Sequence, residues 1–122
     1  MKKILIIEDE EILAEMYKER LEKESFEVFL ASNSKKGLKL AREEKPDLIL
    51  LDILLPDEDG ISFLKELRKD SSISEILVVA LSNYDDPKSK RDAFSLGVKE
   101  YLIKTDYTPK QVVERVKKYL EN

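Results

Sequence analysis

The 122-residue sequence has no cysteine and no histidine, and its apolar runs are short. The absence of cysteine excludes a disulfide framework and thiolate chemistry, and it is compatible with a reducing cytosol. The absence of histidine excludes this side chain as a general base, a zinc ligand or a phosphoryl donor within the chain. Any such group must therefore come from a partner.

No stretch of the sequence approaches the length that is needed to span a membrane. The apolar run at residues 4–7 follows two lysines, but it stops after four residues and acidic residues come next. This is not the pattern of a signal peptide. We therefore expect a soluble cytoplasmic protein that makes no membrane contact.

The length of the chain fits one domain, residues 1–122, with a hydrophobic core of its own. The net charge is −4, but residues 1–86 carry −8 and residues 87–122 carry +4. This asymmetry predicts a cation site in the first part and a surface for an acidic partner in the second, unless it only marks two differently solvated faces. Neither part is basic enough to predict direct nucleic-acid binding.

Five apolar runs alternate with five amphipathic segments, which predicts an α/β fold with a parallel sheet covered by helices on both faces. The first helix is expected to turn Ile12, Leu13, Met16, Tyr17 and Leu21 toward the core. The predicted strands are residues 3–7, 28–31, 48–52, 76–81 and 100–103. The predicted helices are residues 10–23, 34–44, 61–69, 87–96 and 109–120.

The third predicted strand, residues 48–52, is apolar except for Asp52 at its end, and a turn with Pro56 and Gly60 follows. Burying a carboxylate without partners costs several kcal/mol at least. Asp52 is therefore protonated, paired, bound to a metal, or at the rim of the sheet where water reaches it. We interpret it as a reactive carboxylate at the rim.

Polar residues follow the other predicted strands in the same way. Glu8 and Asp9 follow the first strand, Ser82 the fourth and Lys104 the fifth. In an open parallel sheet with right-handed crossovers these positions share the carboxyl edge, where ligands bind. The sequence thus predicts one site made of residues that lie far apart along the chain.

Three carboxylates in one crevice repel each other by roughly 3 kcal/mol per pair at about 5 Å, which one lysine does not offset. Mg²⁺ would, since it takes one or two carboxylates, a phosphate oxygen and waters. Asp9 and Asp52 suit direct contacts, and Glu8 suits an indirect one. Lys104 and Ser82 suit a phosphoryl group carried on Asp52. The inferred chemistry is phosphoryl transfer to a carboxylate.

Each of these residues also has an ordinary structural interpretation. Ser82 alone is typical of a turn, Lys104 alone of a solvated surface, and the acids of residues 8–11 of a helix N-terminus. Asp57, Glu58 and Asp59 are interpreted as turn and capping residues. Only the convergence of the strand ends favours the functional interpretation.

The residues together resemble a receiver domain of a two-component response regulator, of the single-domain chemotaxis-regulator type. The resemblance covers essentially the whole chain. Its motifs are Ile7-Glu8-Asp9-Glu10, Pro46-Asp47-Leu48, Asp52-Ile53, Leu55-Pro56, Asp59-Gly60, Ala80-Leu81-Ser82 and Tyr101-Leu102-Ile103-Lys104.

The resemblance implies a flavodoxin-like (βα)5 three-layer sandwich with strand order 2-1-3-4-5, and Asp52 as the phosphoacceptor. It also implies Mg²⁺ held by Asp9, Asp52 and the backbone carbonyl of Leu54, with Glu8 beside it. Ser82 and Lys104 would contact the phosphoryl oxygens, Tyr101 would be the rotamer partner of Ser82, and Leu54 and Tyr84 would tune the phosphoryl lifetime.

The implied partners are a histidine kinase or phosphotransfer protein as the donor, and a downstream protein target or output domain. The latter would bind the surface of residues 87–96, 100–103 and 109–120, and a phosphorylation-dependent homodimer is a further partner that the resemblance allows. Such a protein is not an enzyme beyond its own phosphorylation and dephosphorylation.

One residue departs from the family pattern, because Thr105 stands where a proline after a cis peptide is usual. A cis bond before another residue costs about 3 to 4 kcal/mol, so the Lys104-Thr105 bond is either trans or strained.

Three alternatives are weighed against the receiver. A nucleotide or flavin binder is disfavoured by the acids after the first strand, and an aspartyl phosphatase by Leu54 in place of a second carboxylate. A receiver-like interaction module that is never phosphorylated remains open.

Overall fold

The computed structural model describes residues 1–121 and contains one parallel sheet of five strands in the order β2-β1-β3-β4-β5. This confirms the predicted fold class. The strands are β1 (Lys3–Ile7), β2 (Glu27–Ala31), β3 (Leu48–Asp52), β4 (Leu77–Ser82) and β5 (Glu100–Ile103). The helices are α1 (Glu11–Lys23), α2 (Ser34–Glu44), α3 (Gly60–Lys69), α4 (Pro87–Ser95) and α5 (Pro109–Lys118), with a 3-10 turn over Lys104–Asp106.

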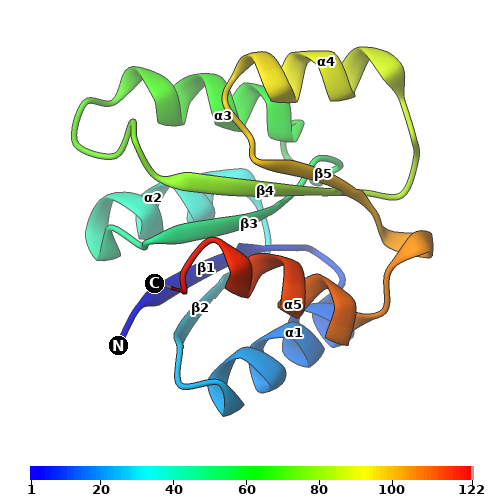
Figure 1. The fold of residues 1–122 in the computed structure, drawn as a ribbon. Coiled ribbons are helices and arrows are strands. Elements are labelled where there is room, and N and C mark those ends of the chain that lie inside the picture. Colours follow the sequence, from blue (N-terminus) through cyan, green and yellow to red (C-terminus); the bar gives the residue numbers. More distant parts are fainter. Residues whose placement is uncertain (122) are drawn as a thin grey trace.

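The helices form a layer on each side of the sheet (Figure 1). One side holds α1 and α5, whose buried side chains pack on β1, β3, β4 and β5 in one apolar cluster. The other side holds α2, α3 and α4, which pack on the opposite face in a second cluster. Because β3 is buried on both faces, all five of its residues lie in the interior, as an apolar run of this kind predicts.

The strand register aligns the carboxyl ends of the strands at one edge. Ile7 pairs with Leu51, and Asp52 pairs with Leu81. In the sheet, β2 lies on one side of β1 and β3 lies on the other. The connection from β1 to β2 and the later connection to β3 therefore run in opposite directions from β1. A crevice for ligands is expected at this point.

Two residues that were predicted to face the core do not. Ile12 is 79% exposed and Met16 is 42% exposed, whereas Ala14, Tyr17 and Leu21 are buried. The prediction was wrong because the apolar residues of α1 allow more than one stripe. The packing of α1 against β2 and α5 selects the stripe that contains Tyr17 and Leu21.

The helix starts follow from local capping. The side chain of Asn33 accepts the N–H of Lys36 at the start of α2, and Asp59 accepts the N–H of Ser62 at the start of α3. Thr108 and Gln111 form a reciprocal capping box at the start of α5. These caps satisfy N–H groups that have no partner within a helix.

Gly60 lies at a close backbone approach beside the end of β3. Its N–H donates to the carbonyl of Ile53 at 2.7 Å, and a Cβ at this position would lie 2.8 Å from Ile53 Cα. We expect Gly60→Ala to lower the free energy of unfolding by about 1 to 3 kcal/mol, because the backbone must move. Urea denaturation beside the exposed Lys65→Ala control, which should change it by less than about 0.5 kcal/mol, checks this. Equal stability of the two variants would contradict the steric argument.

No helix of residues 1–121 is long and apolar enough to cross a membrane.

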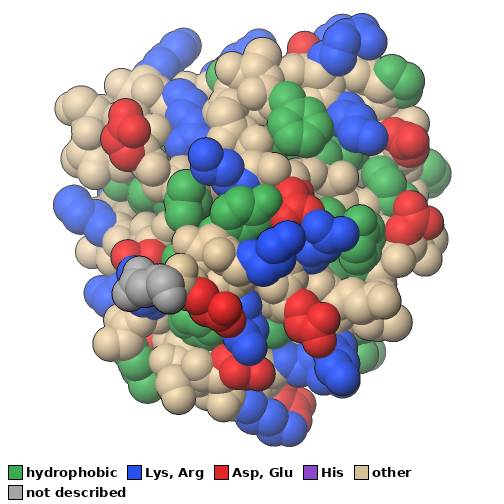
Figure 2. Space-filling view, in the orientation of Figure 1, with side chains coloured by type: hydrophobic (Ala, Val, Ile, Leu, Met, Phe, Trp, Pro, Cys, Tyr) green, Lys and Arg blue, Asp and Glu red, His purple; other side chains and the backbone are tan. Residues whose placement is uncertain are grey.

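Lysine and arginine side chains are interspersed with acidic ones on the face that α5 presents (Figure 2). The positive charge of the C-terminal part therefore does not form one continuous basic surface on this face.

Candidate functional site

Three carboxylates meet at the carboxyl edge of the sheet. Oxygen atoms of Glu8, Asp9 and Asp52 all lie within 4.8 Å of one another, and we call this group the acidic cluster. Asp52, at the end of β3, is 1% exposed and Glu8 is 2% exposed, whereas Asp9 is open to solvent. The parallel strands thus bring together the carboxylates that the sequence predicts at this edge.

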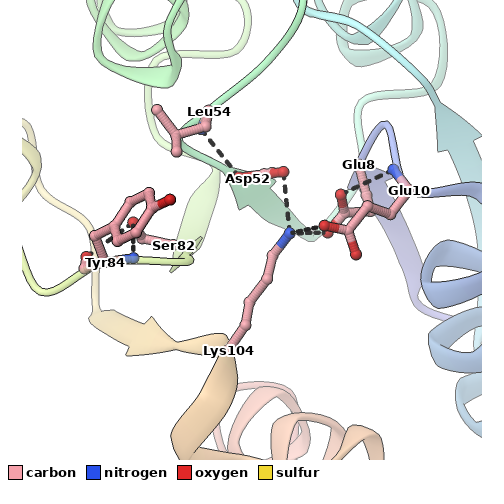
Figure 3. A network of polar contacts seen from close by, with 7 residues as sticks. All are labelled: Glu8, Glu10, Asp52, Leu54, Ser82, Tyr84 and Lys104. Atoms are coloured by element: carbon pink, nitrogen blue, oxygen red, sulfur yellow. Dashed lines mark hydrogen bonds and ion pairs between the residues drawn. The ribbon is translucent and has the colours of Figure 1, made fainter.

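Lys104 reaches into the acidic cluster from the end of β5 (Figure 3). Its Nζ lies 2.7 Å from Glu8 Oε1 and 3.1 Å from Asp52 Oδ2. Glu10 Oε1 lies 3.7 Å from the same nitrogen. Lys104 therefore neutralises part of the charge of two buried carboxylates, although its side chain is itself almost wholly buried.

The other oxygen of Asp52 is held by the backbone. Asp52 Oδ1 accepts the N–H of Leu54 at 3.0 Å, so the loop after β3 folds back over the carboxylate. The Leu54 side chain is half exposed above it. Each oxygen of Asp52 thus has one partner, Lys104 for Oδ2 and the Leu54 N–H for Oδ1. These two contacts fix the orientation of the carboxylate.

Burial makes the carboxyl groups of Glu8 and Asp52 hold their protons more tightly. Burial raises the pKa of Glu8 to about 8, although the hydrogen bond with Lys104 lowers it. Burial also raises the pKa of Asp52 above its ordinary value, against the opposing contributions of Glu8, Lys104 and the Leu54 N–H. Burial lowers the pKa of Lys104, but the hydrogen bonds and charges of Glu8 and Asp52 outweigh this, so its pKa is raised. A bound cation would therefore displace protons from the acidic cluster.

The raised pKa of Glu8 makes a prediction about stability and pH. Between its ordinary value of 4.5 and about 8, the folded protein holds a proton that the unfolded chain has lost. The contribution of Glu8 to stability is therefore complete below pH 4.5 and is lost as the pH rises through 8. Without divalent cations, we expect wild type to lose stability relative to Glu8→Gln over this range, by up to about 1.4 kcal/mol per pH unit. Parallel curves of unfolding free energy against pH would contradict it.

Ser82, whose hydroxyl the sequence predicts to bind a phosphoryl group, forms its hydrogen bonds with the backbone of Tyr84 and not with the acidic cluster. Its Oγ donates to the carbonyl of Tyr84 at 2.9 Å and accepts the N–H of Tyr84 at 3.2 Å. The side chain of Tyr84 is 68% exposed beside the site. Ser82 is buried, and its hydroxyl can donate to a ligand next to Asp52 only after it releases the Tyr84 carbonyl.

Tyr101 on β5 is 7% exposed and packs in the apolar cluster on the α4 side of the sheet. Its hydroxyl is buried and has no hydrogen-bond partner among residues 1–121. A buried hydroxyl without a partner costs about 1 to 3 kcal/mol. The ring thus already lies inside the protein, with its hydroxyl unpaired among the described residues.

The chain around Thr105 accommodates the departure from the family pattern without a cis peptide. None of the described residues has a cis bond, so the Lys104-Thr105 peptide is trans. In the described part of the chain, the ion-pair partners of Lys104 are Glu8, Glu10 and Asp52. The missing proline therefore does not keep the ammonium out of the acidic cluster.

The sequence-based interpretation missed the role of Glu10. Glu10 stands at the N-cap position of α1, as the sequence predicts, but it also contacts Lys104, and its N–H donates to Glu8 Oε2 at 3.1 Å. Its place directly after Glu8 and Asp9 was the available signal. Glu10 thus adds a backbone hydrogen bond to a buried carboxylate and a longer contact to the lysine.

Comparisons with known proteins agree with this geometry. The family model described as "Response regulator receiver domain" matches residues 4–117. The alkaline phosphatase synthesis transcriptional regulatory protein PhoP of Bacillus subtilis (strain 168) is 39% identical over 119 residues, which cover 98% of this chain and 48% of PhoP. The chain therefore spans about half the length of the curated relatives it matches.

Solved structures have the same fold. The Mn²⁺-bound form of response regulator Rcp1 matches with a TM-score of 0.88 and 25% identity, over 100% of this chain and 96% of that one. The BeF3-activated N-terminal receiver domain of RstA from Klebsiella pneumoniae matches with a TM-score of 0.86 and 26% identity, over 99% and 100%. With its parallel sheet, its acidic cluster and its central lysine, the chain belongs to the response regulator receiver domain family of two-component signalling switches.

Proposed function

We propose that the chain is a phosphoacceptor switch in which Asp52 receives a phosphoryl group from a partner phosphohistidine. The observation that carries this proposal is that Asp52 lies within reach of both other carboxylates of the acidic cluster and of the ammonium of Lys104. The Asp52 oxygen attacks phosphorus, the P–N bond to the donor imidazole breaks, and the imidazole keeps the electron pair. Since the chain has no histidine, the donor is a histidine kinase or a phosphotransfer protein.

The acidic cluster fits Mg²⁺. Two ligands of one Mg²⁺ are at most about 4.2 Å apart, so oxygens within 4.8 Å need to move little. Asp9, Asp52 and the carbonyl of Leu54 would hold the ion, with Glu8 beside it. When bound, the ion supplies positive charge that stabilises the transferring phosphoryl oxygens. Rcp1 is described in a Mn²⁺-bound form, which supports a divalent cation here.

The residues of this chain then orient and stabilise the phosphoryl group. Lys104 is placed to pair with a phosphoryl oxygen on Asp52, because its Nζ is already within 3.1 Å of Asp52 Oδ2. Ser82 would leave the backbone of Tyr84 and donate its hydroxyl to another phosphoryl oxygen. Leu54 and Tyr84 flank this position and would tune the phosphoryl lifetime through water access.

The switch would pass from Ser82 to Tyr101 and on to the surface of α4, β5 and α5. Tyr101 already lies inside with an unpaired hydroxyl, so the change would be a shift between two ring positions and not a simple inward turn. A downstream protein or output domain would read this surface, and a phosphorylated homodimer is a second reader. PhoP is named a transcriptional regulatory protein, which supports an output of that class.

One experiment separates this function from its alternatives. The protein is incubated with Mg²⁺ and acetyl phosphate, and intact mass and NMR spectra are recorded. We expect a gain of one phosphoryl group that requires Mg²⁺, with shifts around the acidic cluster. No gain and no Mg²⁺-dependent shift would leave an interaction module that is never phosphorylated. Multiple-turnover release of phosphate from unrelated esters would indicate an aspartyl phosphatase.

A further inference from the structure

The loop between β3 and α3 is tied to the start of α2 by three hydrogen bonds. Asp57 Oδ1 accepts the N–H of Ser34 at 2.9 Å, and Asp57 Oδ2 accepts the N–H of Lys35 at 3.0 Å. Asp57 Oδ1 also accepts the N–H of Glu58 at 3.0 Å, and the Ser34 hydroxyl donates to the Glu58 carboxylate. We call the three bonds that join the loop to Ser34 and Lys35 the loop–helix clamp.

The N–H groups of Ser34 and Lys35, which donate to Asp57, have no acceptor within α2. The first N–H groups of a helix lack partners within the helix, and a carboxylate there is favoured by the helix dipole. Asn33 already accepts the N–H of Lys36, so Asp57 takes the two N–H groups that remain in this turn. Slight burial raises the pKa of Asp57, but hydrogen bonds from Ser34 and Lys35 outweigh it and hold its pKa below the usual value. Asp57 is therefore charged at neutral pH.

The clamped loop is the one that folds over the phosphoacceptor. It begins at Ile53, whose N–H donates to Leu81 at 2.9 Å, and its next residue, Leu54, donates its N–H to Asp52. At its far end Asp59 caps α3. The loop–helix clamp holds the middle of the same loop, so the backbone of Leu54 lies in a segment that is fixed on both sides.

We propose that Asp57 is a positioning residue of the phosphoacceptor site, which through the loop–helix clamp holds the Leu54 backbone against Asp52. This inference rests on the proposed function in so far as Leu54 contributes a metal ligand. A residue that orients a ligand without touching the metal often changes metal affinity strongly.

The test compares Asp57→Ala with Asn33→Ala, which removes a cap from the same helix start and leaves the loop untouched. In metal-free protein, hydrogen exchange of the Leu54 amide should become faster in Asp57→Ala only. The Mg²⁺ dissociation constant from NMR titration should rise about tenfold in Asp57→Ala and stay at the wild-type value in Asn33→Ala. Asp57→Asn keeps one acceptor oxygen and should lie between wild type and Asp57→Ala.

Two results would overturn the proposal. One is that Asp57→Ala and Asp57→Asn both keep the wild-type exchange rate of the Leu54 amide and the wild-type Mg²⁺ affinity. The other is that Asn33→Ala changes Leu54 exchange and Mg²⁺ affinity as much as Asp57→Ala does. That result would show that any loss of order at the start of α2 has the same effect on the site. Because Leu54 exchange is measured without metal or phosphodonor, a failure of phosphorylation itself would leave this test intact.

Discussion

Asp52→Asn should abolish the Mg²⁺-dependent gain of a phosphoryl group from acetyl phosphate. The amide keeps the shape of the side chain and an acceptor for the Leu54 N–H, but it removes the nucleophilic oxygen and a ligand of the acidic cluster. Mg²⁺ affinity should also fall, by about tenfold or more, since one of the three carboxylates is lost. Intact mass spectrometry and NMR titration measure the two effects.

The matched control for this variant is Asp85→Asn. Asp85 is exposed and pairs with Lys90, so the same chemical change there leaves the acidic cluster intact. It should be phosphorylated like wild type. If Asp52→Asn, shown by circular dichroism to be folded, still gains a phosphoryl group at the wild-type rate, the phosphoacceptor is another residue.

Lys104→Met should destabilise the metal-free protein and strengthen the binding of Mg²⁺. The change removes an ammonium that lies 2.7 Å from Glu8 and 3.1 Å from Asp52, and it leaves two buried carboxylates without their cation. Breaking a buried pair in this way costs about 3 kcal/mol of unfolding free energy above pH 8, and less at lower pH, where Glu8 holds a proton. Urea denaturation in EDTA measures this loss.

The gain in Mg²⁺ affinity follows from the same geometry. Mg²⁺ and the ammonium share the carboxylate oxygens, and a single and a double positive charge about 5 Å apart repel by roughly 7 kcal/mol at an effective dielectric constant of 20. Movement of the flexible side chain relieves most of this, so we expect about tenfold tighter binding, or about 1.4 kcal/mol. Saturating Mg²⁺ should then restore much of the lost stability.

The control is Lys90→Met, which removes an exposed lysine that pairs with Asp85 at 3.5 Å. An exposed pair contributes little, so neither stability nor Mg²⁺ affinity should change appreciably. Unchanged Mg²⁺ affinity in Lys104→Met would mean that Lys104 and the cation do not compete for the acidic cluster.

The sequence was sufficient to predict the sheet and the edge where the polar residues meet. The apolar run that ends at Asp52 and the acids after the first strand depend only on local composition, and a parallel sheet brings such strand ends together. The approach of Glu8, Asp9, Asp52 and Lys104 therefore followed from topology alone.

The orientation of individual side chains was not predictable in this way. Ile12 faces solvent because the packing of α1 against α5, and not its own periodicity, decides the rotation of the helix. The hydroxyl of Ser82 binds a backbone two residues away, which a sequence pattern does not specify. The contact of Asp57 with Ser34 spans 23 residues and depends on where two loops meet, so Asp57 was interpreted only as a turn residue.

The most direct test of the central claim locates the phosphoryl group chemically. Protein treated with acetyl phosphate and Mg²⁺ is reduced with borohydride, which converts an acyl phosphate of aspartate to homoserine, and its peptides are sequenced by mass spectrometry. We predict homoserine at position 52 only, and only when Mg²⁺ was present. Homoserine at another aspartate, or a phosphoryl group that borohydride does not remove, would contradict the assignment of Asp52 as the phosphoacceptor.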